Sequence, residues 1–300
     1  MNLFKKVVLK AISRDLYKRR LLAEQDEKFL QKALAHQTEY PPASKTAYAF
    51  KHSGNAGDII YALPALFALS SEATAELYLK LDEPMSSSAE RGRHPMGNVM
   101  LNTKMFSLLR PLLLSQPQLH RCETYAGQAI DYDLDVFRNS AFRLNSGHIA
   151  RWYFLHFGVT ADLGRPWLQV EPEMDFADRI VIARSGGYHA PGIDYSFMKR
   201  YPKLTFVGTP DEFDAMRMVL PRLEYQPVSD FLELARIIAG SRFFIGNQSF
   251  PFSLAEAMKV RRALEVYYVY PNVIVEGGDA YDFCFQPQFE MIVEKLVGST

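Results

Sequence analysis

A polar turn between two apolar runs constrains the fold of this chain more than any other stretch. Residues 53–58 read Ser-Gly-Asn-Ala-Gly-Asp and separate a β-prone run, 46–52, from an apolar run with helical character, 59–69. The two glycines let the backbone turn sharply, and the free N–H groups that begin the following helix favour an anion. This arrangement predicts a strand, a candidate phosphate loop and a helix. The loop residues are Ser53, Gly54, Asn55 and Gly57.

A second turn of the same design lies in the C-terminal half. A predicted buried strand, 242–246, is followed by a polar turn, 247–249, and then by a helical run. Two helix N-termini that face each other across a cleft would suit a phosphate-bearing ligand. Each turn alone is weak evidence, and the first can equally well be an ordinary turn in which Asp58 only caps a helix.

The segments around these turns alternate between strands and helices. A β-prone run at 75–81 completes a βαβ unit, and a second series of strands begins at 179–183 and 204–208. Helices are predicted over 104–115, 148–157, 211–220, 230–239 and 249–258. The pattern predicts an α/β protein with two Rossmann-like domains, whose functional loops lie at the carboxyl ends of parallel strands. The expected segments are a helical extension and linker, 1–45, and two domains, 46–165 and 166–300.

Three smaller patterns complete the structural prediction. Residues 230–233 have the Asp-x-x-Glu spacing of a helix capping box. Asp131, Asp133 and Asp135 alternate as on the polar edge of a strand, and they lack the glycine and the distal glutamate of a calcium loop. Residues 83–98 are rich in Ser, Pro, Gly and charge, which is typical of a long loop such as a flap over a binding site.

Composition excludes several classes of protein. Hydrophobic residues make up 48% of the 300 residues, as in a globular protein with a real core. Lys plus Arg equals Asp plus Glu at 34 each, so no overall field attracts nucleic acid, and we expect no nucleic-acid partner. Cys122 and Cys284 are too few for a disulfide framework or a zinc site, and no signal-type segment opens the chain, which favours the cytoplasm. No apolar run approaches the ~20 residues that span a bilayer.

The N-terminal stretch is basic and has two interpretations. Residues 2–20 hold seven lysines and arginines, and the apolar residues among them follow helical spacing only in part. One interpretation is a basic helix in peripheral contact with an anionic membrane at its inner face. The other is a solvated helix packed on its own domain or on a partner chain, which is favoured because Glu24, Asp26 and Glu27 follow the basic residues.

Two longer motifs surround the polar turns. The first reads Gly-Asp-Ile-Ile-Tyr-Ala-Leu-Pro-Ala-Leu over 57–66, and the second reads Phe-Ile-Gly-Asn-Gln-Ser-Phe-Pro-Phe-Ser-Leu-Ala-Glu-Ala over 244–257. In combination, order and separation they resemble the glycosyltransferases of the GT-B fold, and most closely the lipopolysaccharide heptosyltransferase family, glycosyltransferase family 9. The α/β pattern extends this resemblance over residues 46–275. The resemblance implies two Rossmann-like domains that face each other across a cleft.

The resemblance also implies a reaction. A sugar would pass from a nucleotide-sugar to a glycan, lipid or protein acceptor without a metal or other cofactor, and the loop 53–57 would lie beside the acceptor. Asp58 matches the proposed general base of the family, which removes the proton of the acceptor hydroxyl while preorganised groups stabilise the leaving diphosphate. Glu256 matches a glutamate that contacts the nucleotide ribose in retaining GT-B enzymes, and a solvent-facing helix residue is the alternative. Inversion and retention both stay open. The predicted donor-binding residues are Arg184, Ser185, His189, Asn247, Gln248, Ser249 and Glu256.

The second motif departs from the family in three places. Where the family has Asp, Ser or Thr, and Gly, followed by a His, this chain has Gln248, Ser249, Phe250 and then Ser253. Phe250 denies a ligand close approach to the backbone, and the missing Asp and His remove a charge and a hydrogen-bond donor. Two other functions therefore stay open: a nucleotide-sugar epimerase of the same architecture, and a non-catalytic GT-B-like protein that binds a glycan or a nucleotide.

Overall fold

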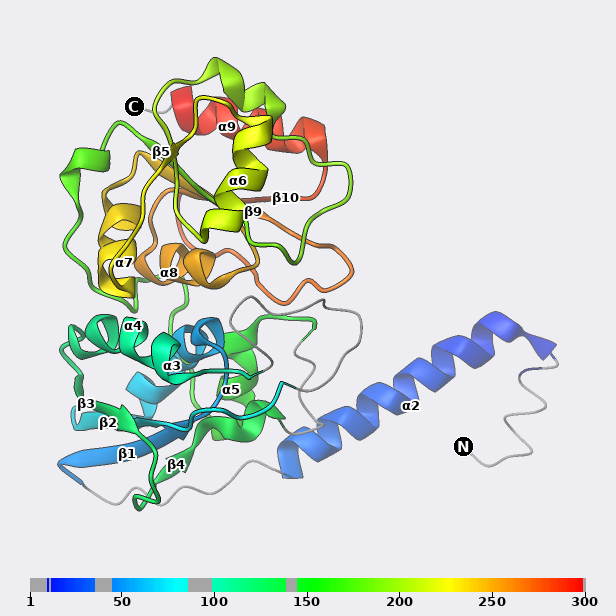
Figure 1. Ribbon diagram of the computed structural model, residues 1–300. Coiled ribbons are helices and arrows are strands. Elements are labelled where there is room, and N and C mark those ends of the chain that lie inside the picture. Colours follow the sequence, from blue (N-terminus) through cyan, green and yellow to red (C-terminus); the bar gives the residue numbers. More distant parts are fainter. Residues whose placement is uncertain (1–9, 11, 36–44, 86–98, 139–144, 299–300) are drawn as a thin grey trace.

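The chain forms two parallel β-sheets, one in each half of its body (Figure 1). The computed structural model describes residue 10 and residues 12–35, 45–85, 99–138 and 145–298. Most of the predicted long loop, residues 86–98, and the predicted linker at 40–44 lie outside the described residues.

The first sheet has the strand order β3-β2-β1-β4, and its neighbouring strands are parallel. Its elements are β1 (Ala47–His52), α3 (Ala56–Ser70), β2 (Thr74–Leu79), α4 (Thr103–Leu114), β3 (Leu119–Thr124), β4 (Tyr132–Asp133), the 3₁₀ helix η1 (Leu134–Arg138) and α5 (Ile149–Phe157). The strand order reverses between β1 and β4. Ligands of open α/β sheets bind at such a switch point, outside the carboxyl ends of the strands. The turn that follows β1 lies at this place.

The second sheet has the order β10-β9-β8-β5-β6-β7 and is also parallel. Its elements are η2 (Met174–Phe176), β5 (Ile180–Ala183), η3 (Ser196–Arg200), β6 (Leu204–Phe206), α6 (Pro210–Val219), β7 (Glu224–Tyr225), α7 (Phe231–Gly240), β8 (Phe243–Asn247), α8 (Phe250–Met258), β9 (Arg262–Glu265), β10 (Ala280–Phe283) and α9 (Gln286–Gly298). The switch point lies between β5 and β8. The predicted α/β class and the parallel sheets are confirmed, and we propose a domain boundary near residue 165.

Alternation along β5 divides the apolar side chains between two clusters. Val181 and Ala183 belong to one cluster and Ile180 and Ile182 to the other, because successive residues of a strand point to opposite faces of the sheet. The first cluster continues through α7 and α8 into α3 and α4 of the other half. The helix α3 packs on α8 and α4 packs on α7, so the two halves share one apolar core (Figure 1).

The start of α7 corrects one detail of the sequence prediction. Asp230 caps the helix by accepting a hydrogen bond from the backbone N–H of Glu233 at 2.9 Å. In a full capping box the Glu233 carboxylate would accept from the N–H of Asp230. It accepts instead from the backbone N–H and the hydroxyl of Ser229, each at 2.6 Å. The predicted box is therefore only half formed, and the serine one residue earlier takes the second bond.

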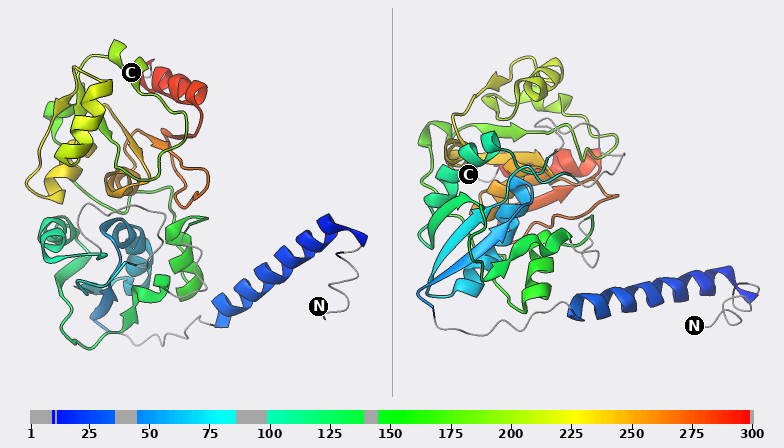
Figure 2. Two further views of the ribbon diagram at one scale, coloured as in Figure 1. Left: turned by 45° about the vertical axis from the view of Figure 1, so that its right-hand side comes forward. Right: turned by 60° about the horizontal axis from the view of Figure 1, so that its bottom comes forward.

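The N-terminal helix α2 (Arg14–Ala35) stands away from the body, as two further views show (Figure 2). It meets the body near its C-terminal end, where the ring of Phe29 lies edge to face against Trp152 of α5, with ring centroids 5.5 Å apart. The described part of the expected extension, 1–45, is thus helical between residues 14 and 35. Within the described residues no helix combines the length and the apolar character needed to cross a membrane.

Candidate active site between the two halves

The two predicted turns meet between the halves of the molecule. Gly57, in the first turn of α3, lies against the first turn of α8: a Cβ atom added to it would be 3.9 Å from Phe250 Cα and 3.9 Å from Ser253 Oγ. These are ordinary van der Waals distances. Since both helices begin here, their partly positive N-terminal ends converge on one place. Asp58 follows Gly57 and is half-buried at this meeting point.

Asp58 caps its own helix. The backbone N–H of Asn55 donates a hydrogen bond to the Asp58 carboxylate at 3.3 Å. A carboxylate offers about four lone-pair positions, so this bond is compatible with a second role. The negative charge of Asp58 also reaches two buried tyrosines: burial is the main cause that raises the pKa of Tyr61 and of Tyr153 far above the usual value, and Asp58 adds to it.

His52 supports the loop that leads to Asp58. The side chain is completely buried, its Nδ1 accepts from the backbone N–H of Gly54 at 2.8 Å, and its Nε2 lies 2.8 Å from Tyr153 Oη. Because Nδ1 is an acceptor, the proton sits on Nε2, which donates to Tyr153. Burial lowers the pKa of His52 to about 4, so the ring is neutral at pH 7. This tautomer fixes the backbone of the loop.

Ser53 is held by the segment that follows β4. Its hydroxyl donates to Asp135 at 2.5 Å, and its carbonyl accepts from Arg138 Nη2 at 2.9 Å. Asp135 also forms an ion pair with Lys51 at 3.2 Å. Burial opposes ionisation of Asp135, but the nearby His52, Ser53 and Lys51 outweigh it and lower the pKa of Asp135. The Ser53 hydroxyl therefore fastens the loop across the first switch point.

The three alternating aspartates lie at the edge strand, as predicted. Asp131 accepts from the backbone N–H of Ala49 at 2.9 Å, and Asp133 accepts from Lys51 at 2.7 Å. With Asp135, they connect β4 and the residues beside it to β1. Among the described residues, no group of three or more His, Cys, Asp and Glu side chains is arranged to hold a metal ion.

Asn247 binds the loop after β5 at the second switch point. It is completely buried, its Oδ1 accepts from the backbone N–H of Ser185 at 3.0 Å, and its Nδ2 donates to the carbonyls of Ser185, at 3.1 Å, and of Gly187. His189 Nε2 lies 2.5 Å from the same Ser185 carbonyl. The structure thus brings Asn247, Ser185 and His189 together, and they bind one another.

Gln248 and Ser249 follow Asn247 in this turn and have different hydrogen-bond partners. The Gln248 amide nitrogen donates to the carbonyl of Tyr270 at 2.7 Å and to Asn272 Oδ1 at 2.6 Å, and its oxygen accepts from the backbone N–H of Tyr267 at 2.7 Å. Gln248 therefore fastens the loop after β9. Ser249 precedes α8, and its hydroxyl donates back to the carbonyl of Asn247 at 3.2 Å.

Arg184 is oriented by a buried carboxylate. Its Nε and Nη2 donate to the two oxygens of Glu265 at 2.7 Å each, and its guanidinium lies 4.8 Å from the ring centroid of Tyr195. Burial lowers the pKa of Arg184, but Glu265 and Tyr195 raise it, and the net change is upward. The arginine side chain keeps 18% of its surface exposed while that of Glu265 has none. Within the described part of the chain, Nη1 has no partner, so this edge of the fork is open to a ligand.

Glu256 makes its bonds inside the protein. Its side chain is completely buried, and one carboxylate oxygen accepts from Arg262 Nε at 2.6 Å. The other oxygen accepts from Lys259 and, at 3.2 Å, from the backbone N–H of Glu276. Glu256 is therefore not a solvent-facing residue of α8, and in this conformation both of its oxygens bind other parts of the protein.

Three tyrosines that were not predicted from the sequence gather beside these turns. The ring of Tyr188, in the loop after β5, is 6.5 Å from those of Tyr267 and Tyr270, which are 5.6 Å apart in the loop after β9. We call these three residues the tyrosine cluster. Tyr188 has a left-handed backbone with φ of 54°, a conformation that costs a non-glycine residue roughly 1–3 kcal/mol. The only signal in the sequence is the aromatic run that follows the strand-like residues 262–266.

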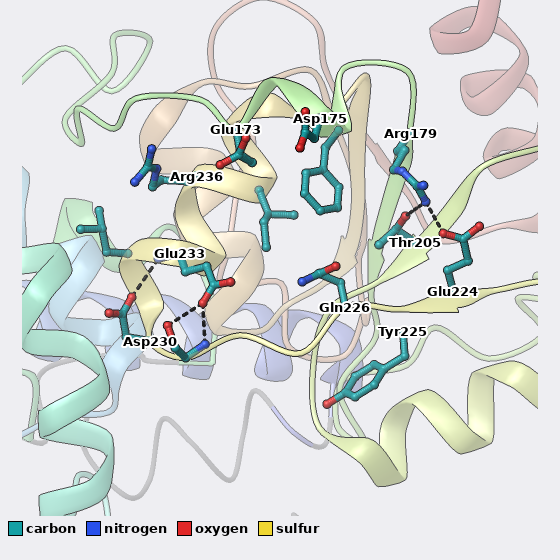
Figure 3. Close-up of a pocket in the computed structure, with 14 residues that line it drawn as sticks. Glu173, Asp175, Arg179, Thr205, Glu224, Tyr225, Gln226, Asp230, Glu233 and Arg236 are labelled. Atoms are coloured by element: carbon teal, nitrogen blue, oxygen red, sulfur yellow. Dashed lines mark hydrogen bonds and ion pairs between the residues drawn. The ribbon is translucent and has the colours of Figure 1, made fainter.

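A separate pocket of about 620 Å³ lies on the second half, between α7, β6 and β7 (Figure 3). Five carboxylates and two arginines line it, so its charge would repel a diphosphate. In Figure 3 three of its polar side chains bind one another: Arg179 donates to Thr205 at 3.1 Å and forms an ion pair with Glu224. None of the predicted site residues lines this pocket, and the meeting point of the two turns remains the candidate site.

Comparison with known proteins supports the fold. No protein-family model matches this chain, and the curated proteins contain no match. A solved glycosyl transferase of family 9 from Veillonella parvula is similar over 88% of this chain and 91% of its own, with 12% identity and a TM-score of 0.50. The E. coli heptosyltransferase WaaC with ADP is similar over 83% of this chain and 99% of its own, with 9% identity and a TM-score of 0.54. This likeness confirms the predicted GT-B architecture.

Proposed function

We propose that this protein is a glycosyltransferase that moves a sugar from a nucleotide-sugar donor to a hydroxyl group of an acceptor. The observation that carries the proposal is the contact between the first turns of α3 and α8, because it brings a half-buried carboxylate, Asp58, to the place where two helix N-termini converge. A transfer of this kind needs a base for the acceptor and positive potential for the leaving diphosphate. A carboxylate and two helix N-termini meet between α3 and α8, and this supports the proposal.

In the proposed reaction, Asp58 accepts the proton of the acceptor hydroxyl as the bond to the sugar forms. The open Nη1 edge of Arg184 and the N-terminus of α8 stabilise the charge that develops on the leaving diphosphate. The donor would be a nucleoside diphosphate sugar, and ADP is the first probe because the similar WaaC structure contains it. Ser185, Asn247 and Gln248 keep the surrounding loops in place, through bonds to one another and to the tyrosine cluster.

The proposal has three further parts. We propose a metal-independent mechanism, a glycan, lipid or protein acceptor, and a cytoplasmic location with peripheral membrane contact of the basic helix as one option. The epimerase alternative predicts an isomerised nucleotide-sugar in the absence of any acceptor. One observation favours the non-catalytic alternative: the side-chain amides of Asn247 and Gln248 form hydrogen bonds to other groups of the protein. This alternative predicts that the protein binds a nucleotide or a glycan without turnover.

The role of Asp58 is tested by the change Asp58→Asn. Asparagine is an equally good helix cap but cannot accept the proton, so we expect turnover to fall by about 10²–10⁴-fold. The melting temperature and the affinity for ADP should stay nearly unchanged. The matched control is Asp230→Asn, the same change at the cap of α7, which should leave turnover intact. A stable and fully active Asp58→Asn protein would show that Asp58 only caps α3.

The tyrosine cluster should contribute to binding of the donor's base. Tyr267 contacts both other members, and base–aromatic stacking is worth ~1–3 kcal/mol, so Tyr267→Leu should weaken binding of ADP by roughly 5- to 150-fold. Calorimetry with ADP and with pyrophosphate, which has no base, separates the contributions. Pyrophosphate affinity should not change. Equal losses for both ligands would mean that the cluster only shapes the phosphate site.

A further inference from the structure

The side of α2 that does not face the body carries an exposed apolar stripe. Residues seven apart complete nearly two helical turns, so Leu16, Ala23 and Leu30 lie above one another, and Leu34 follows one turn later. Leu16 is 55%, Leu30 49% and Leu34 46% exposed, and Ala23 is exposed as well. We call these four residues the leucine face. Phe29, which contacts Trp152, points about 100° away from Leu30 around the helix, so packing on the body leaves this face uncovered.

The charges beside the leucine face are arranged symmetrically about Ala23. Arg19 and Arg20 precede Ala23 by one turn, and Asp26 and Glu27 follow it by one turn. Arg19 and Asp26 lie on one flank of the stripe, and Arg20 and Glu27 on the other, since each pair is seven residues apart. All four side chains are exposed. Arg19 pairs with Asp15 of its own helix at 3.1 Å, but such an exposed pair is worth little and exchanges readily.

We propose that the leucine face binds the same face of a second copy of this chain, as an antiparallel pair of α2 helices with Ala23 at the two-fold axis. In this arrangement Leu16 packs on Leu30 of the second copy and Ala23 packs on its own counterpart. Arg19 then lies beside Asp26, and Arg20 beside Glu27, of the second copy, and the symmetry makes each ion pair twice. A parallel pair would bring Arg19 beside Arg20 and Asp26 beside Glu27. Repulsion between these like charges disfavours the parallel arrangement.

The position of α2 permits this association. The helix extends from the body with its N-terminal end farthest away, so the two bodies would lie at opposite ends of the pair (Figure 2). The overlap, residues 14–32, is about 28 Å long at ~1.5 Å per residue. Such an interface is small, and we expect a dissociation constant of ~1–100 μM.

The first test measures the mass of the full chain by sedimentation over a range of concentrations. The wild-type protein should pass from monomer to dimer, and Ala23→Glu should stay monomeric because it places two carboxylates face to face. The matched control is Gln25→Glu, which adds the same charge on the opposite side of α2 and should dimerise like the wild type. A wild-type protein that stays monomeric at ~1 mM, about ten times the upper limit of the expected dissociation constant, overturns the proposal. The same holds for loss of the dimer in Gln25→Glu.

The second test examines the ion pairs of the proposed interface by charge reversal. A variant with Arg19→Glu and Arg20→Glu has an acidic face throughout, and a variant with Asp26→Arg and Glu27→Arg has a basic one. Each alone should be monomeric, and an equimolar mixture should form a heterodimer. Failure of the mixture to associate rejects this pairing. Wild-type protein that remains monomeric but co-sediments with vesicles containing phosphatidylserine would assign the face to a membrane and reject the second copy.

Discussion

His52 and His148 show how single buried side chains shape the loops around the site. The Nδ1 atom of His148 accepts from the backbone N–H of Ala150 at 3.1 Å and caps α5, as that of His52 accepts from Gly54. Burial is the main cause that lowers the pKa of His148 to about 3, and the cations Arg151 and Lys259 add to it. Each histidine can accept its bond only while it is neutral, so both loops depend on pH.

Stability should therefore fall in mild acid. The pKa of His52 is about 4 in the folded protein and the usual pKa of a histidine is 6.5, so the unfolded chain binds the proton first. The contribution of neutral His52 to the free energy of unfolding is fully present above pH 6.5 and is lost as the pH falls towards 4. The loss is about 1.4 kcal/mol per pH unit for each histidine. Denaturant unfolding between pH 7.5 and pH 5 measures this slope. His52→Asn keeps an acceptor near the position of Nδ1 but cannot take up a proton. The free energy of unfolding of this variant should therefore depend less steeply on pH, by one proton. An unchanged slope would contradict the low pKa of His52.

At the level of elements, α8 and β9 are joined by a buried ion pair. Glu256 of α8 and Arg262 of β9 are both completely buried, and Arg262 also donates to the carbonyls of Val260, at 2.8 Å, and Glu276, at 2.5 Å. These bonds fix the path of the chain after β9. The loop that carries two members of the tyrosine cluster, Tyr267 and Tyr270, begins directly after β9.

Removal of one partner should destabilise the protein strongly. Glu256→Gln leaves Arg262 and Lys259 without their counter-charge, and a broken buried pair costs ~3–5 kcal/mol. Urea unfolding measures this loss. The control is Glu294→Gln, which removes an exposed partner of Arg200 and should cost at most about 1 kcal/mol. If Glu256 instead bound the donor ribose, its variant would keep its stability and lose affinity for ADP.

The elements were predictable from the sequence to the extent that their signals are local. Apolar periodicity and the adjoining turns gave β1 and α8 within two residues, and the second strand series matches β5, β6 and β8. The function of Gln248 was not predictable, because its partners lie about twenty residues further along and no local pattern encodes them. Burial of Glu256 depends on Arg262 and on a distant backbone N–H, so its helix position alone suggested a ribose contact or an exposed side chain.

At the scale of the whole molecule, the shared core makes the two halves one unit. Trp167 lies at their junction: its indole N–H donates to the carbonyl of Ile60 in α3 at 3.1 Å, and its backbone N–H donates to that of Ala257 in α8 at 2.9 Å. Lys259 stands 4.6 Å from the centre of its ring. Neither half can lose this contact without exposing apolar surface of the other.

Unfolding should therefore be one cooperative transition. Tryptophan fluorescence, which reports on Trp152 and Trp167, and far-ultraviolet circular dichroism should give the same midpoint in urea. Trp167→Ala should lower both midpoints together, since truncation of a packed tryptophan costs ~3–5 kcal/mol. Two separate transitions in the wild-type protein would show that the halves fold independently.

Phe250 has a consequence for how far the turn before α8 can open. Its ring lies 4.4 Å from that of Phe231, centroid to centroid, and so ties the first turn of α8 to α7 at a position where the family it resembles has glycine. Phe250→Gly would remove an aromatic contact worth ~0.5–1.5 kcal/mol, and a partly buried ring with it, before a more open turn could bring any advantage. A glycine at this position would therefore require α7 to be repacked before the turn could open without loss of stability.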